Sequence, residues 1–463
     1  MSSHPTKLTD PTHLGGGAAK VVRAAGIAGV AGLVTAIAAG LFSAGGYRRF
    51  LFAYLVAFCF CLTVALGALV FVLLQHLTRA GWSVTVRRTA EAVAGTLPVL
   101  GVLSLPILVS VATGNGALYR WALPTSAAVT AEENAAPAAE AKHGEAKQGE
   151  AAADPHAAKA EPSAVRAADS DPAQFAHPVL DPLTFKKRAW LNPAFFIARV
   201  LAYFAIWTVI ARWYRARSVE QDRTGDPAVT ARMQKWAPLS VIATAVTATF
   251  ASFDLVMSLD PHWYSTIFGV YFIAGSFVAS FATLILAATL LQRAGYLRSA
   301  VTPEHYHDLG KYLFGFVFFW GYIAFSQYML LWYANIPEET RWFARHGATT
   351  VPQDVSGWSY LAIVVLFAHL LIPFPGLLSR HIKRRVGPLV FWAGWLLVAH
   401  YLDLYWVIVP EAGGDLAVHV ADVAAVVGVG GVCVAAAVRL LAGESVVPTK
   451  DPRLPEALAF QNI

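Results

Sequence analysis

Long apolar runs are the feature of this sequence that most limits its fold. Each run has roughly 20 or more mostly apolar residues, the length that an α-helix needs to cross the hydrocarbon core of a bilayer. The composition agrees, because 57% of the 463 residues are hydrophobic and 14% are charged, whereas about 25% of the residues in a typical soluble domain are charged. The sequence therefore predicts an all-α polytopic membrane protein with ten spans, at residues 24–44, 49–76, 90–113, 190–212, 237–258, 263–292, 309–334, 357–378, 386–409 and 418–441.

The basic residues are distributed unevenly among the short loops, and this distribution predicts the orientation. The termini and the loops after spans two, four, six and eight are rich in Lys and Arg, whereas the other short loops hold Arg48, Arg49, Arg341 and Arg345. Short loops rich in Lys and Arg stay in the cytoplasm, so we expect both termini there. The net charge of +6 does not indicate nucleic-acid binding, because the cations lie in these loops between spans.

The connection between spans three and four is unusually long. Its middle, residues 127–170, is a mixture of Ala, Glu, Lys and Pro, and such a segment has too few large apolar side chains to fold alone. We expect a low-complexity insert on the periplasmic side. The predicted parts are an N-terminal cytoplasmic tail (1–23), spans one to three (24–113), the insert (114–189), spans four to ten (190–442) and a C-terminal cytoplasmic tail (443–463).

The cysteines lack the spacing of a redox site. Cys59, Cys61 and Cys433 all lie inside apolar runs, and the sequence has no CxxC or CxxCH motif. This pattern argues against a covalently attached haem c, an iron–sulfur cluster, a structural disulfide or a metal site in this chain. Buried cysteines of this kind pack as small apolar side chains.

Several ionisable residues lie within or near the ends of the apolar runs, where charge is costly and a functional role is the default hypothesis. His400 and Asp403, like His419 and Asp422, are three residues apart, so each pair shares a helix face and can exchange a proton near neutral pH. The candidate proton-path residues are His76, Glu91, Lys311 and the deeper His369 toward the cytoplasm, and Asp254, His400, Asp403, His419 and Asp422 in the outer half.

Other roles stay open for most of these groups. Five of them lie near water, where polar side chains are ordinary: His76, Glu91, Lys311, His419 and Asp422. His369 can be satisfied by a hydrogen bond to neighbouring backbone, whereas Asp254, His400 and Asp403 are deeper and favour a function. A membrane haem b needs two histidines at matching depth, and the sequence places His369 in the inner half and His400 in the outer half, which makes them a poor axial pair.

The segment FDLVMSLDPHWYSTIFGVYF (253–272) reads as two spans joined by a tight turn. Asp260 precedes a proline, which disfavours helix at that position, and Asp-Pro is a common helix start. We therefore expect Asp260 and Pro261 to begin span six, with Trp263 and Tyr264 in the aromatic belt at the outer interface. Asp254 lies inside the preceding apolar run and is the candidate with a function.

Four blocks of the sequence resemble a known family. They are RFLFAYLVAFCFCLTVALGALVFVLLQHLTRAGWSVTVRR (49–88), LNPAFFIARVLAYFAIW (191–207), FDLVMSLDPHWYSTIFGVYF (253–272) and DLGKYLFGFVFFWGYIAFSQYMLLWYANIPEET (308–340). They are similar to the ActF-type membrane subunit of bacterial alternative complex III, a quinol:electron-acceptor oxidoreductase. The resemblance covers most of spans two to nine, but not the insert or the tails.

The resemblance implies a fold and a set of partners. The fold is that of NrfD/PsrC-like subunits, with spans two to five and six to nine in two four-helix bundles and two peripheral helices. The partners are a homologous ten-helix quinol-oxidising subunit, multihaem and monohaem cytochrome c subunits, an iron–sulfur subunit and a terminal oxidase, with no nucleic acid. The haem c and iron–sulfur clusters belong to those partners. The location is the bacterial inner membrane.

The resulting hypothesis is an accessory subunit that scaffolds a quinol-oxidising complex and conducts protons, without a redox centre or cofactor of its own. One alternative is that this subunit binds quinone or quinol itself, with His400, Asp403, Tyr405 and Trp406 around the ring. A second is a secondary transporter, which the sequence disfavours because the predicted breaks, Asp260-Pro261 and Pro373-Phe374-Pro375, fall at helix ends. A third is a purely structural subunit.

Overall fold

Ten membrane-length helical segments build the molecule, as the sequence predicts. The computed structural model describes residues 8–43, 45–123, 182–348 and 355–462, and within these ranges ten segments are long and apolar enough to cross a membrane. The chain is an all-α polytopic membrane protein. Eight of the segments contain one continuous long helix, namely α1 (Gly17–Leu41), α2 (Gly46–Leu77), α8 (Pro193–Thr224), α9 (Pro227–Leu255), α10 (Phe268–Arg293), α11 (Pro303–Ala334), α16 (Val386–Ile408) and α17 (Val420–Ala442).

Spans three and eight are interrupted. The third consists of α3 (Val84–Ala94), α4 (Leu97–Leu103) and α5 (Leu105–Ala112), and the eighth of α13 (Gly357–Val365), the π-helical turn η6 (Leu366–Leu371) and α14 (Pro373–Leu378). Proline interrupts α-helices because it lacks an N–H and clashes with the preceding turn, and both α4 and α5 have a proline in their first turn.

The spans form two bundles around a shared centre. In the first, α2 packs against α3 and α9, and α8 packs against α4 and α9. In the second, α10 packs against α11 and α16, and the α13–η6–α14 span packs against both of those helices. The two most buried spans, α2 and α10, join the bundles. This arrangement confirms the expected grouping of spans two to five and six to nine into two bundles.

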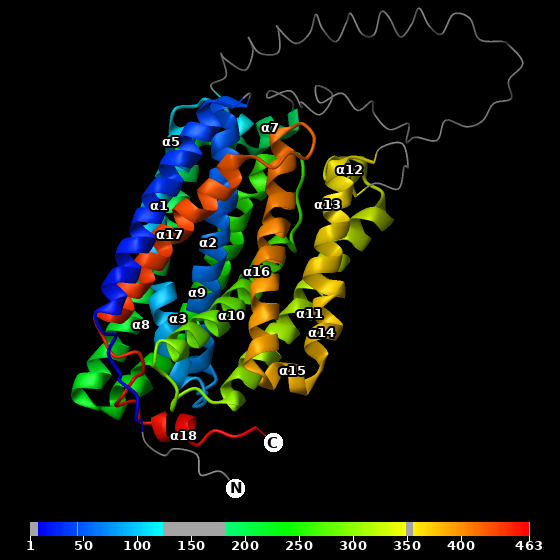
Figure 1. Ribbon diagram of the computed structural model, residues 1–463. Coiled ribbons are helices and arrows are strands. Elements are labelled where there is room, and N and C mark those ends of the chain that lie inside the picture. The colour runs from blue at the N-terminus through cyan, green and yellow to red at the C-terminus, as the bar shows by residue number, and fades with distance from the viewer. Residues whose placement is uncertain (1–7, 44, 124–181, 349–354, 463) are drawn as a thin grey trace, which may run out of the picture.

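Helices α1 and α17 are peripheral and pair with each other along one flank (Figure 1). Glycines allow their backbones to approach closely. A Cβ atom at Gly32 would lie 2.5 Å from the backbone nitrogen of Gly428, a distance at which no side chain fits. Small residues at such contacts are typical of helix pairs in membranes.

The break in span eight lies in the middle of the span, so the expectation that breaks fall at helix ends is wrong here. Pro373 cannot donate a backbone hydrogen bond, and the turn before it relaxes to i→i−5 bonding, in which Ile372 N–H donates to Phe367 O (2.9 Å). This leaves the carbonyl of Ala368 without its α-helical donor, and Trp395 Nε1 supplies one (2.7 Å). The helix is thereby re-formed rather than stopped.

The connection between spans five and six is longer than the predicted tight turn. After α9, a short turn η4 (Met257–Leu259) is followed by irregular chain, and α10 begins at Phe268 with Ile267 as its N-cap. Asp260 is therefore not the cap of span six. Its carboxylate instead accepts from the backbone N–H of His262 (2.9 Å) and pairs with Arg345 (3.2 Å). Both contacts give it a structural role in the connection.

The two aromatic residues of that connection differ in exposure. Trp263 is buried and stacks on Trp342 with ring centroids 4.1 Å apart, whereas Tyr264 is exposed. The remaining short elements cap the bundle ends. They are η1 (Arg120–Ala122), α7 (Pro182–Lys186), η3 (Lys187–Ala189), α12 (Pro337–Arg345), α15 (Arg380–Arg384), η7 (Val409–Ala412) and α18 (Leu454–Leu458).

The described parts of both chain tails lie at one end of the bundle, which we call the tail end (Figure 1). Val446 N–H donates to Thr12 O (2.7 Å), so the two tails pair with each other. The C-terminal segment continues across this end, where Asp451 pairs with Arg87. The opposite end, which we call the far end, holds α5 and α7 (Figure 1). Residues 124–181, which make up most of the predicted insert, lie outside the described ranges.

Candidate functional site

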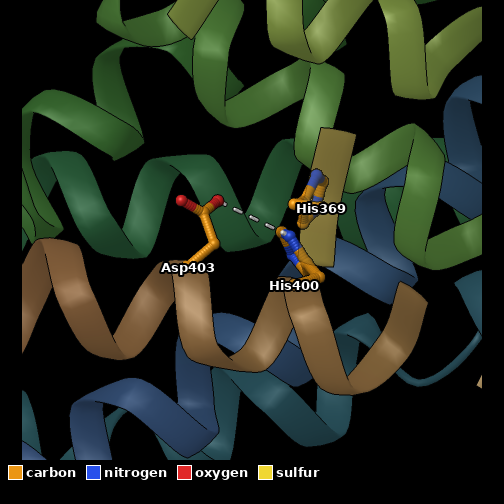
Figure 2. Close-up of side chains that lie close together, drawn as sticks. All are labelled: His369, His400 and Asp403. Carbon is orange, nitrogen blue, oxygen red and sulfur yellow. Dashed lines mark ion pairs between the residues drawn. The ribbon is translucent and has the colours of Figure 1, made fainter. Parts of the chain in front are cut away.

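Three ionisable side chains meet in the interior of the second bundle, and we call them the His–His–Asp cluster: His369, His400 and Asp403. His369 lies on η6, and the other two are one turn apart on α16 (Figure 2). The rings of His369 and His400 have centroids 5.9 Å apart, and His400 Nδ1 is 4.0 Å from Asp403 Oδ2. Each side chain is at most 2% exposed. The cluster is therefore sealed from solvent on all sides.

The matching depth of the two histidines corrects the sequence-based placement in opposite halves of the membrane. Span eight runs from Gly357 to Leu378 and span nine from Val386 to Ala412, so both histidines lie near the middle of their spans. The depth argument against an axial pair is therefore wrong. A different objection to a haem remains, because Asp403 lies beside the His400 ring and Trp320 packs against the His369 ring.

Neighbouring helices shape the space for both rings. Trp320 of α11 packs against His369 with ring centroids 3.8 Å apart. On α10, a Cβ atom at Gly275 would lie 2.7 Å from His400 Cε1, so the glycine provides room for the imidazole. The π-helical turn carries His369 toward α16, and such turns are frequent at functional sites.

The hydrogen bonds of Thr63 assign the tautomer of His400. The Thr63 hydroxyl donates to Phe60 O (2.8 Å), so its oxygen is left to accept from His400 Nε2 (3.0 Å). A neutral imidazole carries one N–H, which leaves Nδ1 of His400 with a lone pair on the side of Asp403. Thr63 therefore orients the basic nitrogen into the cluster.

The other two members have contrasting environments. Tyr271 of α10 donates a short hydrogen bond to Asp403 Oδ1 and fixes the carboxyl group. Neither ring nitrogen of His369 finds a hydrogen-bond partner within the described residues. A buried polar atom without a partner costs about 1–3 kcal/mol, so the fold retains His369 at a cost in stability.

The geometry of the cluster suits two roles, binding of a metal ion and transfer of a proton. One potential ligand atom from each of the three side chains lies within 4.8 Å of the others. Two imidazoles and a carboxylate can hold a divalent metal ion if they draw together. They can also pass a proton between a carboxylate and an imidazole, directly or through one water molecule.

Asp254 lies in a different kind of site. Its carboxylate receives two hydrogen bonds from Arg199, at 2.9 Å from Nε and 2.8 Å from Nη2, one from Tyr203 (2.8 Å) and one from Trp190 Nε1 (3.0 Å). The Arg199 guanidinium also lies over the Trp190 ring, 4.1 Å from its centroid. Four donors saturate the carboxylate, which favours a structural role.

The three tail-end candidates, Glu91, His76 and Lys311, each have a different local partner. Glu91 lies 3.4 Å from Arg87 and 3.2 Å from Arg88, and Arg88 also pairs with Asp222 at 2.7 Å. His76 packs on the Tyr214 ring with centroids 5.5 Å apart. Lys311 is half exposed and pairs with Asp308 (2.5 Å). These contacts are with neighbours at the tail end, not with the His–His–Asp cluster.

The second predicted His–Asp pair starts a helix. His419 is the N-cap of α17, where its Nδ1 accepts from the Ala421 N–H (3.2 Å) and Asp422 Oδ2 accepts from the His419 N–H (2.8 Å). Asp422 also pairs with Arg49. This capping box satisfies backbone donors of the first turn, and the two residues therefore have contacts typical of a structural role.

A further buried network at the far end was not predicted from the sequence. Arg345 pairs with Glu411 (2.5 Å) and with Asp260 (3.2 Å). His346 beside it is fully buried against Trp342, and burial lowers the pKa of His346 to about 3. The ring is consequently neutral at physiological pH. No local motif indicated this network, because its members come from three separate segments.

The four residues of the quinone alternative do not surround one space. Tyr405 donates to Ala417 O (3.1 Å) near the start of α17, and Trp406 Nε1 donates to His346 O (2.7 Å). Both therefore point away from the His400–Asp403 pair. The aromatic neighbours of the cluster that the sequence did not indicate are Tyr271 and Trp320, although Tyr271 lies within the 253–272 segment.

Comparison with protein-family models and with curated proteins finds no match for this chain.

Proposed function

We propose that this chain is an integral membrane subunit of a quinol-oxidising respiratory complex of the alternative complex III type, and that its His–His–Asp cluster takes part in proton transfer. The observation that carries the second part is that, among the described residues, neither ring nitrogen of fully buried His369 and not Nδ1 of neighbouring His400 has a hydrogen-bond partner. An ionisable group kept in a membrane interior without full compensation is a functional-site hypothesis by default.

The proton role follows from comparing the buried carboxylates. Asp254 is held by a guanidinium and two aromatic donors, so moving a proton onto it would break an ion pair. Asp403 has one hydroxyl donor, from Tyr271, and faces an imidazole nitrogen 4.0 Å away. A water molecule between these two atoms would complete a relay from carboxyl to imidazole.

The proposal includes partners and a location. The homologous ten-helix subunit would oxidise quinol, and the cytochrome c and iron–sulfur subunits would carry the haem c and iron–sulfur clusters. A terminal oxidase would accept electrons further along. The tail end, with the N- and C-terminal tails, would face the cytoplasm of a bacterium, and the insert would face the periplasm. Support comes from the four resembling sequence blocks and from the two-bundle arrangement.

The test uses the intact complex reconstituted in sealed vesicles. Proton release per electron is measured together with the electron-transfer rate for Asp403→Asn, for His369→Gln and for Asp254→Asn as the matched buried-carboxylate control. We expect a lower ratio in the first two variants and an unchanged ratio in the control. An unchanged number of protons released per electron in both cluster variants would contradict a role of the cluster in proton transfer.

Secondary transport is the second candidate, because the π-helical break of η6 lies in mid-span, where transporters have broken helices. Purification distinguishes the two. A chain that is isolated alone, with no haem-containing protein attached, supports transport; a chain isolated with cytochrome c subunits supports the respiratory complex.

A further inference from the structure

The turn between spans eight and nine is strongly basic. It contains the sequence SRHIKRR (379–385), and its short helix α15 lies at the tail end, directly between the membrane-spanning segments (Figure 1). Side chains in this position reach the level of the lipid headgroups on that side of the bilayer. The basic groups of the turn can therefore contact another part of a protein, water or the phosphate of a lipid headgroup.

Some of these cations have partners within the chain. Lys383 donates to the carbonyls of Leu377 (2.7 Å) and Leu378 (2.8 Å), which are at the end of α14. Arg384 pairs with Glu304. The nearby Asp308 is already engaged by Lys311 (2.5 Å). The local carboxylates are therefore used by other cations.

Arg380 and Arg385 are the other two arginines of this turn. Both are exposed, and neither forms an ion pair with any residue in the described ranges. The arginines at the far end differ, since Arg345 pairs with Glu411 and Arg49 with Asp422. Two exposed guanidiniums at opposite ends of a five-residue helix thus lack the compensation that these far-end arginines have.

Exposed apolar side chains lie close to these arginines along the chain, two residues before Arg380 and six residues after Arg385. Leu378, at the end of α14, is 60% exposed, and Phe391, on α16, is 57% exposed. In a membrane this surface contacts acyl chains. A phosphate above and an acyl chain below is the chemical pattern of a phospholipid, and basic sites between membrane helices are suited to anionic headgroups.

We propose that Arg380 and Arg385 bind the phosphate headgroup of an anionic phospholipid whose acyl chains cover Leu378 and Phe391. The guanidinium group suits this ligand, because it donates paired hydrogen bonds to phosphate oxygens. The site holds a structural lipid at the hinge between spans eight and nine. It is independent of proton transfer by the cluster, and either conclusion can fail without the other.

The test compares two charge-matched double variants of the full chain. Arg380→Gln/Arg385→Gln removes the site, and Arg232→Gln/Lys235→Gln removes two exposed cations from α9, on another part of the tail end. Each purified protein is placed in phosphatidylcholine nanodiscs with or without phosphatidylglycerol, and co-purifying native lipid is quantified by mass spectrometry. We expect about thirtyfold less retained anionic lipid in the first variant, from the loss of two charges near the surface at about 1 kcal/mol each, and no change in the second.

Two further arms distinguish a bound phospholipid from a free phosphate and from a general loss of folding. Arg380→Lys/Arg385→Lys keeps the charge and should recover part of the lipid binding, and thermal unfolding of each variant confirms that it is folded. Inorganic phosphate is titrated in detergent as a ligand without acyl chains. Equal lipid retention in all folded variants overturns the proposal, and so does binding of inorganic phosphate as strong as that of phosphatidylglycerol.

Discussion

Asp254 and Asp403 are both fully buried carboxylates in the membrane-spanning part of the chain, yet their surroundings differ. Asp254 lies in the first bundle within an arginine, a tyrosine and a tryptophan that together supply four hydrogen bonds. Asp403 lies in the second bundle with a hydroxyl donor, Tyr271, and two neighbouring imidazoles, three of whose ring nitrogens have no hydrogen-bond partner in the described part of the chain. The first site is saturated and the second is not.

Depth alone therefore does not identify a functional acid. A buried charge is tolerated when its partners replace the water that it loses, and the resulting ion pair fixes local structure. A group whose hydrogen-bonding capacity is left open is costly to fold, so its retention calls for a function. On this criterion the functional assignment moves from Asp254 to the His–His–Asp cluster.

The greatest loss of stability should come from disrupting the saturated site at its arginine. Arg199→Ala leaves the Asp254 carboxylate buried without its counter-ion, and we expect the free energy of unfolding to fall by about 3–5 kcal/mol. Thermal unfolding of the purified variant measures this change. Arg199→Leu/Asp254→Leu, which removes both charges, should recover a large part of the loss. If Arg199→Ala is as stable as the parent, the structural assignment of Asp254 is wrong.

A pH titration tests His346, a buried histidine at the far end that lies outside the His–His–Asp cluster. The pKa of His346 is lowered to about 3 by burial, against about 6.5 in an unfolded chain. The unfolded state therefore binds more protons between these values, and stability is lost as the pH falls below about 6.5. The loss from this residue amounts to about 2 kcal/mol between pH 7 and pH 5.

The measurement is the unfolding temperature at pH 7 and pH 5 in the parent and in His346→Phe. The variant keeps an aromatic ring against Trp342 but has no imidazole to protonate, so its unfolding temperature should fall less over this range. An equal fall in both proteins would show that His346 does not control the acid sensitivity.

Features that depend on a local pattern could be predicted from the sequence. The lengths of the apolar runs predicted all ten spans, because a bilayer imposes a fixed length on each of them. The three-residue spacing placed His400 and Asp403 on one face of α16, as found. The same spacing in His419 and Asp422 instead built a capping box, since these residues precede and begin a helix.

Features that depend on how separate spans meet could not be predicted in this way. The meeting of His369 and His400 depends on how spans eight and nine pack and on the π-helical turn before Pro373, and no local pattern in the sequence shows either feature. The partners of Asp254 come from residues more than fifty positions earlier. Arg199 clearly needs a partner, but helix spacing along one chain cannot say which acid faces it.

A substitution at Thr63 tests the orientation of His400, and we expect it to lower stability less than the changes above. Thr63→Val keeps the side-chain volume and removes the oxygen that accepts from His400 Nε2 (3.0 Å), so we expect a loss of about 1 kcal/mol in unfolding free energy. Proton release per electron should fall as well, because the ring is no longer held with Nδ1 toward Asp403. Thr244→Val is the matched control, since Thr244 is equally buried and its hydroxyl has no partner in the described structure. A full proton ratio in Thr63→Val would remove Thr63 from the relay.

The least change in stability is expected at Asp403 itself. Asn has nearly the same shape as Asp and keeps an oxygen that can accept from Tyr271, so Asp403→Asn should change the free energy of unfolding by less than about 1 kcal/mol. Asp254→Asn breaks the pair with Arg199 and leaves a buried guanidinium without its counter-charge, so the same chemical change there should cost several times more. Parallel thermal unfolding of the two variants measures the ratio. Equal losses would mean that the two carboxylates are held alike, and the distinction between a saturated and an open site would no longer support a special role for the cluster.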